Sequence, residues 1–258
     1  MRSETFCGNC LDFMAALPDE CVDLTVTSPP YDGLRDYKGY SFDWKSTLMQ
    51  LYRISKRGGV VVWVVNDQTA DGSESGTSFR QALYAMECGF KLHDTMIWDK
   101  GTVTYPDNNR YLPSFEYMFV FSKDAPKTFC PIKDRPNIWA GTKAHGTWRQ
   151  KDGSLKAKTD KKQVFEEYGM RFNVWKIPAE KHNTTGHPAV FPLRLAKDHI
   201  ASWSNEGDVV FDPFLGSGTT RIAAYEMRRE FMGCEISREY FEKQERRFAE
   251  IAAQTRMF

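Results

Sequence analysis

The sequence predicts an α/β fold with a mostly parallel sheet and helices on both of its faces. Short runs rich in β-branched residues alternate with segments of helical periodicity, a pattern typical of successive strand, helix and strand units. A glycine-containing turn at residues 212–218 joins a strand to a helix, as turns at the carboxyl ends of parallel strands do. The 258 residues, of which 41% are hydrophobic, suffice for one large domain with an insertion.

The first half of the chain contains four predicted strands, at residues 22–27, 59–65, 92–98 and 117–121. Between the second and third, residues 78–88 have the periodicity of a helix. Phe79, Leu83 and Met86 fall at spacings of four and three and form one apolar stripe. Gly89 is suited to end this helix.

The second half begins with a segment, residues 122–185, that has no clear periodicity and looks inserted. It is followed by a strand, a helix, a strand and a final amphipathic helix at residues 208–211, 218–229, 231–235 and 238–254. We therefore predict one domain made of residues 1–121 and 186–258, with residues 122–185 as an insertion.

Composition excludes several classes of protein. The formal charge is only +1, so a polyanion partner requires local clusters of cations. The longest apolar run, residues 60–65, is far too short to span a bilayer, and the N-terminal residues lack the apolar core of a signal peptide. Six scattered cysteines, including Cys7 and Cys10, lack the partners of a zinc site. We expect a cytoplasmic protein that binds neither a membrane nor a metal.

A rigid loop of hydrogen-bond acceptors follows the strand at residues 22–27, and it consists of Ser28, Pro29, Pro30 and Tyr31. The consecutive prolines stiffen the loop, so that the Ser28 hydroxyl and the Pro29 carbonyl can accept hydrogen bonds in a fixed geometry. Two such acceptors suit the two hydrogens of a nucleobase amine, whose delocalised lone pair they would draw out, while Tyr31 stacks on the base. The alternative is that these residues form only a stiff turn.

A second loop has the features of a nucleotide cradle. Gly216 and Gly218 permit a tight turn and the close approach of a ligand, but the loop lacks the Gly-Lys-Ser/Thr of a Walker motif. Glu235 ends the next strand, where a carboxylate can bind both hydroxyls of a ribose; alternatively, it is a surface residue that caps the final helix. The order of strand, glycine loop, helix, strand and acid favours a cofactor site.

With these two motifs the chain resembles the DNA amino-methyltransferases, specifically the permuted β group in which the catalytic motif precedes the cofactor motif. Ser28 to Tyr31 match the catalytic tetrapeptide, residues 212–218 the cofactor loop, and Glu235 the ribose-binding acid. The resemblance covers most of the chain and implies a Rossmann-like S-adenosylmethionine-dependent methyltransferase fold, with S-adenosyl-L-methionine as cofactor. It implies cofactor contacts from Asp212, Pro213, Phe214, Gly216, Gly218 and Thr219.

Two further segments resemble parts of the family's cofactor site. One precedes a helix and would lie along the methionine part of the cofactor through His187, Pro188 and Phe191, although His187 is equally well a helix-start histidine without a ligand. The other places Asn9 and Cys10 near the cofactor adenine, with asparagine where the family usually has aspartate. The Asn9 amide can still exchange hydrogen bonds with an adenine edge; the alternative is a plain turn residue.

The predicted insertion is locally basic, with fourteen Lys and Arg residues against half as many Asp and Glu. Interleaved aromatic residues such as Trp139 and Trp148 fit a target-recognition region for double-stranded DNA, with the target base flipped out of the duplex; the alternative is a solvated loop. The residues predicted to contact DNA are Lys143, Arg149, Lys151, Lys156, Lys158, Lys161 and Lys162. We expect a monomer or a homodimer.

The identity of the methylated base depends on one side chain. Within the family, serine at the first position of the tetrapeptide is commoner in cytosine-N4 enzymes and aspartate in adenine-N6 enzymes, so Ser28 favours cytosine N4. Adenine N6 is the alternative. RNA or a small molecule as substrate, and a non-catalytic nucleic-acid-binding module, are further alternatives. A nicotinamide oxidoreductase is disfavoured because its glycine loop normally follows the first strand.

Overall fold

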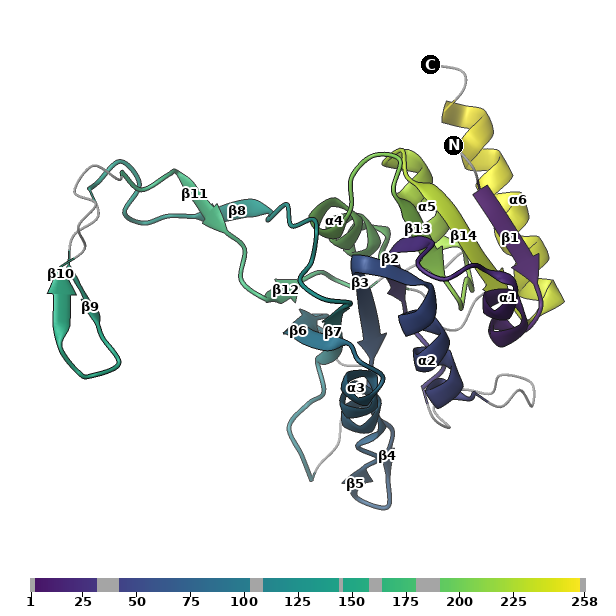
Figure 1. The fold of residues 1–258 in the computed structure, drawn as a ribbon, viewed down its shortest axis with the longest axis horizontal. Coiled ribbons are helices and arrows are strands. Elements are labelled where there is room, and N and C mark those ends of the chain that lie inside the picture. Colours follow the sequence, from purple (N-terminus) through teal and green to yellow (C-terminus); the bar gives the residue numbers. More distant parts are fainter. Residues whose placement is uncertain are drawn as a thin grey trace. The chain divides into compact units, whose positions relative to one another are not determined.

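The structure is a computed structural model, and it describes residues 3–31, 42–102, 109–143, 146–157, 164–179 and 191–255. The chain divides into two compact units (Figure 1). The larger unit comprises Met1–Cys130 and Asn173–Phe258, and the smaller one comprises Pro131–Phe172. Each unit is described by itself.

The larger unit is built on an eight-stranded sheet. In order across the sheet, its strands are β1 (Ser3–Cys7), β14 (Glu230–Glu235), β13 (Val209–Asp212), β2 (Val22–Thr27), β3 (Ser55–Val65), β7 (Phe115–Ser122), β6 (Lys91–Asp99) and β12 (Val174–Lys176). Strand β7 runs antiparallel to both of its neighbours, and the other pairings are parallel. This confirms the predicted α/β fold with a mostly parallel sheet.

Six helices accompany this sheet in the described part of the chain, and they are α1 (Cys10–Ala16), α2 (Trp44–Ile54), α3 (Thr77–Glu87), α4 (Leu193–Trp203), α5 (Thr219–Glu226) and α6 (Arg238–Thr255). Side chains at their starts satisfy backbone N–H groups: Asn9 accepts from Leu11 N, and Asp43 accepts from Ser46 N. None of the helices described is long and apolar enough to cross a membrane.

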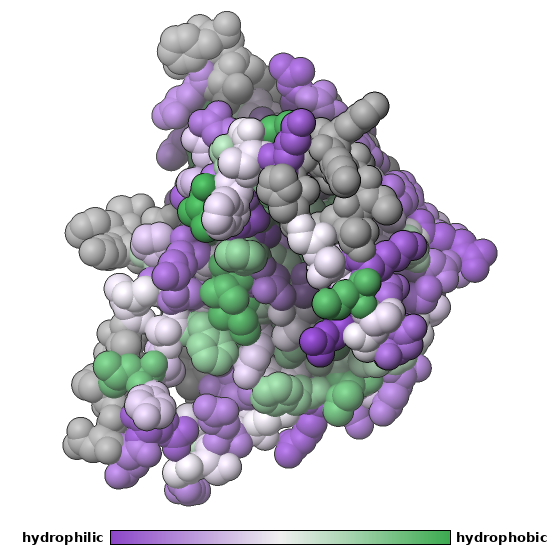
Figure 2. All heavy atoms as spheres, turned by 90° about the vertical axis from the view of Figure 1, so that its left-hand side faces the viewer, coloured by the Kyte–Doolittle hydropathy of each residue, from purple (hydrophilic) through white to green (hydrophobic). Residues whose placement is uncertain are grey.

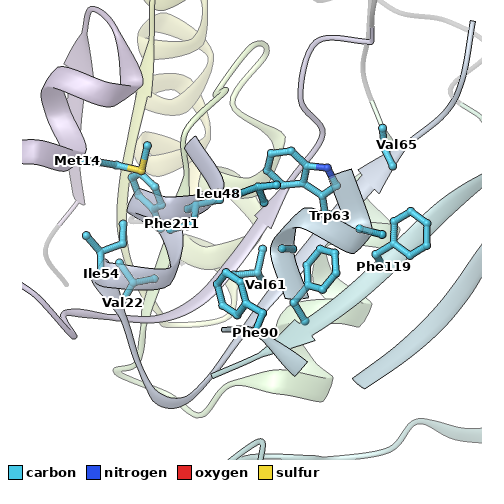
Figure 3. Packing of buried hydrophobic residues seen from close by; sticks show 14 of the residues in the cluster. Met14, Val22, Leu48, Ile54, Val61, Trp63, Val65, Phe90, Phe119 and Phe211 are labelled. Atoms are coloured by element: carbon cyan, nitrogen blue, oxygen red, sulfur yellow. The ribbon is translucent and has the colours of Figure 1, made fainter. Parts of the chain in front are cut away.

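The helices cover both faces of the sheet, because side chains alternate between faces along each strand. Val61, Trp63 and Val65 of β3 belong to one apolar cluster with residues of α1, α2 and α3, including Met14 and Leu48 (Figure 3). The intervening β3 valines, at positions 60, 62 and 64, are equally buried and point to the opposite face. There, helix α4 contacts α5 and β2. Each large side chain buried in this way contributes about 1.5–3 kcal/mol to stability.

Helix α3 turns a different face to the sheet from the one that its apolar stripe indicates. Phe79, Leu83 and Met86 are exposed, whereas the buried face includes Gln81 and Ala82. The reason is a specific contact: Trp63 Nε1, fully buried, donates a hydrogen bond to Gln81 Oε1 at 2.8 Å. Small residues and one amide thus face the sheet because they satisfy the indole N–H, and the larger side chains face outward.

Short antiparallel pairs complete the structure. In the larger unit they are β4 (Thr69–Ala70) and β5 (Ser73–Glu74); in the smaller unit they are β8 (Lys133–Pro136) with β11 (Tyr168–Met170), and β9 (Thr147–Arg149) with β10 (Leu155–Ala157). No residue described in the smaller unit is buried. Ion pairs between Arg171 and Asp134 and between Lys133 and Glu166 link its strands and loops instead.

Candidate active site

Two loops that follow adjacent parallel strands meet at one edge of the sheet. Strand β2 ends at Thr27 and strand β13 at Asp212, and the two strands pair in parallel. Thr27 Oγ1 donates a hydrogen bond to Asp212 Oδ1 at 2.6 Å. The loop that starts at Ser28 and the glycine loop are therefore fixed to each other at the edge where open α/β sheets bind ligands.

The carboxylate of Asp212 is buried and accepts hydrogen bonds from its own loop. Besides Thr27, the backbone N–H of Phe214 donates to Oδ1 at 3.0 Å. Burial raises the pKa of Asp212 above its ordinary value, while hydrogen bonds from Thr27, Phe214 and Thr220 oppose that shift. The side chain of this predicted cofactor residue thus shapes the loop that follows it.

The glycine loop is a tight turn whose conformation requires its glycines. Gly216 and Gly218 have φ values of 49° and 78°, in the left-handed region that side chains disfavour. Gly218 stands directly before α5, and Thr219, the first residue of that helix, is buried. The backbone N–H of Leu215 donates to Cys234 O at 2.9 Å, so the loop lies against the end of β14.

Glu235 joins the glycine loop to the end of β14. Its Oε2 accepts a hydrogen bond from Gly216 N and its Oε1 from Ser237 N, each at 2.9 Å. Burial raises the pKa of this carboxyl, and the two backbone N–H groups oppose the rise. Since a carboxylate oxygen has more than one lone pair, both oxygens can also accept from a pair of ligand hydroxyls. A glycine turn beside a carboxylate with spare acceptor capacity fits a cofactor that carries a ribose.

The catalytic tetrapeptide predicted from the sequence lies partly buried at the same edge. Pro29 is buried, and Ser28, Pro30 and Tyr31 are half-buried. Ser28 Oγ and Tyr31 Oη are 2.8 Å apart, within hydrogen-bond distance. The serine hydroxyl is thus tied to the phenol three residues later.

Two charged residues that the sequence did not single out extend this contact. Tyr31 Oη donates to Glu116 Oε2 at 2.8 Å, and Lys100 Nζ lies 3.1 Å from Glu116 Oε1. Glu116 belongs to β7, and Lys100 directly follows β6. The one signal in the sequence is a charged residue in a strand that is otherwise aromatic and apolar, and it gives no indication of what the residue contacts.

Comparisons with known proteins agree with this arrangement. A sequence profile of the N6/N4 methyltransferases, described as DNA methylase, matches residues 22–246. The chain belongs to this family of DNA methylases. It is therefore an S-adenosylmethionine-dependent DNA methyltransferase that acts on an exocyclic amino nitrogen, N4 of cytosine or N6 of adenine.

Individual relatives support the assignment. The orphan methyltransferase M.BamHII of Bacillus amyloliquefaciens is 55% identical over 230 residues, which cover 86% of each chain. The DNA modification methylase TTHA0409 from Thermus thermophilus, solved in complex with S-adenosyl-L-methionine, superposes with a TM-score of 0.67 at 27% identity over 96% of this chain and 94% of that one. The PvuII DNA methyltransferase (cytosine-N4-specific) has a TM-score of 0.69 at 19% identity, covering 97% and 91%, and shows a common fold.

The remaining predicted cofactor residues of the methylase occupy several positions around this edge. Asn9 caps α1, with Oδ1 accepting from Leu11 N at 2.9 Å. The Cys10 thiol lies 3.9 Å from Thr47 Oγ1, and burial raises its pKa to about 11, so it is protonated at neutral pH. Gly8 N donates to Glu235 O at 2.9 Å, which brings the end of β1 beside the end of β14.

The aromatic and proline positions of the predicted cofactor site have mainly packing contacts. The ring of Phe214 lies edge-on to that of Phe42, with centroids 5.1 Å apart, and Pro213 O accepts from Cys234 Sγ at 3.3 Å. Phe191 is half-buried just before α4. His187 and Pro188 lie outside the described residues.

The predicted DNA contacts of the methylase fall in the smaller unit. Lys143, Arg149, Lys151 and Lys156 are exposed, and no ion pair involves them among the residues that the structure describes. Lys158, Lys161 and Lys162 lie outside the described residues. Within residues 122–185, two cations have other roles: Lys123 and Lys127 belong to the larger unit and form ion pairs there.

Metal ligands do not cluster in the described residues: no group of three or more His, Cys, Asp or Glu side chains is placed to hold an ion there. Cys7 and Cys10, the pair with a CxxC spacing, are free thiols.

Proposed function

We propose that this methylase transfers a methyl group to N4 of cytosine in double-stranded DNA, after flipping the cytosine out of the duplex. The observation that carries the proposal is Ser28, a hydroxyl at the first position of the tetrapeptide, fixed beside the glycine loop through Thr27 and Asp212. Flipping is required because a stacked and paired base cannot bring its amine to the pocket. Adenine N6 is the second candidate, since both bases present the same amino geometry.

The residues of this chain would activate the amine by hydrogen bonding. When bound, S-adenosylmethionine supplies a methyl group on a positively charged sulfur. The Ser28 hydroxyl and the Pro29 carbonyl accept the two amine hydrogens, which localises the nitrogen lone pair and orients it for in-line attack. Glu235 holds the ribose of the cofactor, while Gly216 and Gly218 let the backbone approach it.

The modified nucleoside identifies the base. The purified protein is incubated with S-adenosylmethionine and unmethylated duplex DNA, and the digested nucleosides are identified by chromatography and mass spectrometry. We expect N4-methylcytosine. N6-methyladenine would overturn the choice of base and leave the family and the cofactor in place.

A variant tests the assignment of the catalytic loop. Ser28→Ala removes one acceptor, so turnover should fall by about tenfold or more while the affinity for S-adenosylmethionine stays unchanged. Ser46→Ala, a hydroxyl on α2, is the matched control and should retain full activity. A wild-type rate for Ser28→Ala would rule out the proposed role of the tetrapeptide.

We further propose that residues 131–172 contact the DNA. Large apolar side chains are exposed among the cations of this unit, with Trp139 and Trp148 both more than 60% accessible. On the hairpin of β9 and β10, Lys156 pairs directly with Trp148, which places a phosphate-binding group beside a base-contacting one. Figure 2 shows hydrophobic side chains exposed among hydrophilic ones on one face of the chain. A unit without a buried residue has its side chains available to a partner.

The salt dependence of binding tests this DNA contact. Replacing Lys151 and Lys156 with alanine should weaken DNA binding and lower the slope of log K against log salt by about one for each cation that meets a phosphate. Lys243→Ala removes a cation of α6 that pairs with Glu239, and it should leave the slope unchanged. An unaltered slope in the double variant would place the DNA surface elsewhere.

A further inference from the structure

A row of hydrogen-bonded side chains connects the catalytic loop to two neighbouring strands. Ser28 Oγ lies 2.8 Å from Tyr31 Oη, Tyr31 Oη donates to Glu116 Oε2 at 2.8 Å, and Lys100 pairs with Glu116 Oε1 at 3.1 Å. The Lys100 and Glu116 side chains are only 21% and 14% exposed. Water therefore has limited access to this ion pair, and Lys100 leaves one carboxylate oxygen to Tyr31.

The chemistry of these groups fixes the direction of the hydrogen bonds. A phenol has one proton, and a carboxylate can only accept. The other acceptor near the phenol, Val64 O at 3.2 Å, cannot donate either. Tyr31 therefore directs its proton away from Ser28, and its oxygen accepts the proton of the Ser28 hydroxyl. A serine that donates to Tyr31 has its own lone pairs left to accept from another group.

This direction matters because serine, unlike aspartate, can act as a donor or as an acceptor. A target amine offers hydrogens to the enzyme, so a hydroxyl that points its own proton at the amine would oppose binding. We propose that Glu116, held by Lys100, is a positioning residue that orients Tyr31 and thereby makes Ser28 a hydrogen-bond acceptor for the amine of the target base. This inference rests on the proposed role of Ser28 in the reaction.

The variant Glu116→Gln changes the direction without removing the side chain. The glutamine amide can donate to Tyr31 Oη, which leaves the phenol proton free to turn toward Ser28. We expect kcat to fall by about tenfold, with the dissociation constant for S-adenosylmethionine unchanged. Glu87→Gln, an exposed carboxylate at the end of α3, is the control and should behave as wild type.

Double variants separate positioning from a general structural effect. In a Ser28→Ala or a Tyr31→Phe background the route from Glu116 to the amine is already broken, so adding Glu116→Gln should cost no further activity. A structural role would instead give equal losses in every background. Equal, additive losses, or a wild-type rate for Glu116→Gln alone, would overturn the inference.

A binding measurement decides the point without turnover. Duplexes that carry either the target base or its analogue lacking the exocyclic amine, 2-pyrimidinone for cytosine and purine for adenine, are compared for affinity. Glu116→Gln should reduce the preference for the amine-bearing base and leave the affinity for the analogue unchanged; an unchanged preference would overturn the inference.

Failure of this inference can be distinguished from failure of the proposed function. If Ser28→Ala methylates at the wild-type rate and keeps the wild-type preference for the amine, the role of Ser28 is wrong, and the role of Glu116 is wrong with it. If Ser28→Ala is impaired while Glu116→Gln keeps both the rate and the preference, only the role of Glu116 is wrong.

Discussion

Replacing Glu235 with glutamine separates two roles of one carboxylate. In the folded protein each oxygen of Glu235 accepts a backbone N–H at 2.9 Å, from Gly216 and from Ser237, and the residue is only 8% exposed. A glutamine has a single carbonyl oxygen, so one of the two N–H groups would face an NH₂ donor. We expect the free energy of unfolding to fall by about 1–2 kcal/mol, because a buried unsatisfied donor costs about 1–3 kcal/mol and removing a buried charge offsets part of that.

The effect of Glu235→Gln on the cofactor is larger than this loss of stability alone would cause. If ribose hydroxyls donate to the carboxylate, the substitution replaces a charged acceptor by a neutral one and turns one oxygen into a donor. Hydrogen bonds to charged groups contribute about 1.5–3 kcal/mol, and about 1.4 kcal/mol corresponds to a tenfold change in affinity. We expect S-adenosylmethionine to bind at least about tenfold more weakly, as measured by titration calorimetry at a temperature where the variant is folded.

The pH dependence gives an independent check. Burial raises the pKa of Glu235 above its ordinary value of 4.5, so the folded state holds this proton more tightly than the unfolded state does. Its contribution to stability is full below pH 4.5 and is lost as the pH rises through the folded pKa. Wild type should therefore lose stability relative to Glu235→Gln across that window, while its affinity for S-adenosylmethionine rises as the carboxylate forms.

The control for these measurements lies on the same strand. Glu230→Gln, at the opposite end of β14, should leave the affinity for S-adenosylmethionine unchanged. If Glu235→Gln lowers the melting temperature but binds the cofactor with wild-type affinity, then Glu235 only holds the glycine loop, and the predicted ribose contact is wrong.

Two further substitutions test the energetics of the fold. Asp23→Ala should lower the free energy of unfolding by about 3 kcal/mol in a urea titration, because Asp23 is buried and accepts from Lys56, Lys127 and the Val209 N–H. Burial alone would raise the pKa of Asp23, but these hydrogen bonds lower it, so its contribution is present above pH 3.8 and is lost as the pH falls through the folded pKa; an equal loss at about pH 3 and pH 7 would contradict this. Gln81→Ala should cost about 1–3 kcal/mol by leaving the buried indole N–H of Trp63 unpaired, and a loss below about 0.5 kcal/mol, roughly that of an exposed site, would show that water reaches it.

Much of the fold could be predicted because burial in a parallel sheet leaves a strong local signal. The apolar run at residues 22–27 forms β2 with the predicted bounds, and β14 extends the predicted strand at 231–235 by one residue. Helix α5 is shorter than predicted, since it begins at Thr219 and ends at Glu226. The insertion at 122–185 stays a prediction, and the structure gives a compact unit at residues 131–172.

The face that α3 buries could not be predicted from periodicity. Its largest apolar side chains, Phe79, Leu83 and Met86, form the stripe that normally marks a buried face, yet they are exposed. A hydrogen bond between Gln81 and the indole of Trp63, eighteen residues away in sequence, determines the rotation of the helix. Such a bond depends on where the strand lies, which periodicity does not encode.

The sequence by itself determined the order of strands and helices, the family, and the two loops that carry its motifs. These follow from local patterns, because a buried strand, a glycine turn and a stiff proline loop each leave their mark within about ten residues. Only the tertiary structure brought Glu116 to Tyr31 across 85 positions, and Glu235 to the N–H of Gly216 across 19. These contacts depend on which strands are neighbours in the sheet, and strand order is decided by the packing of the whole unit.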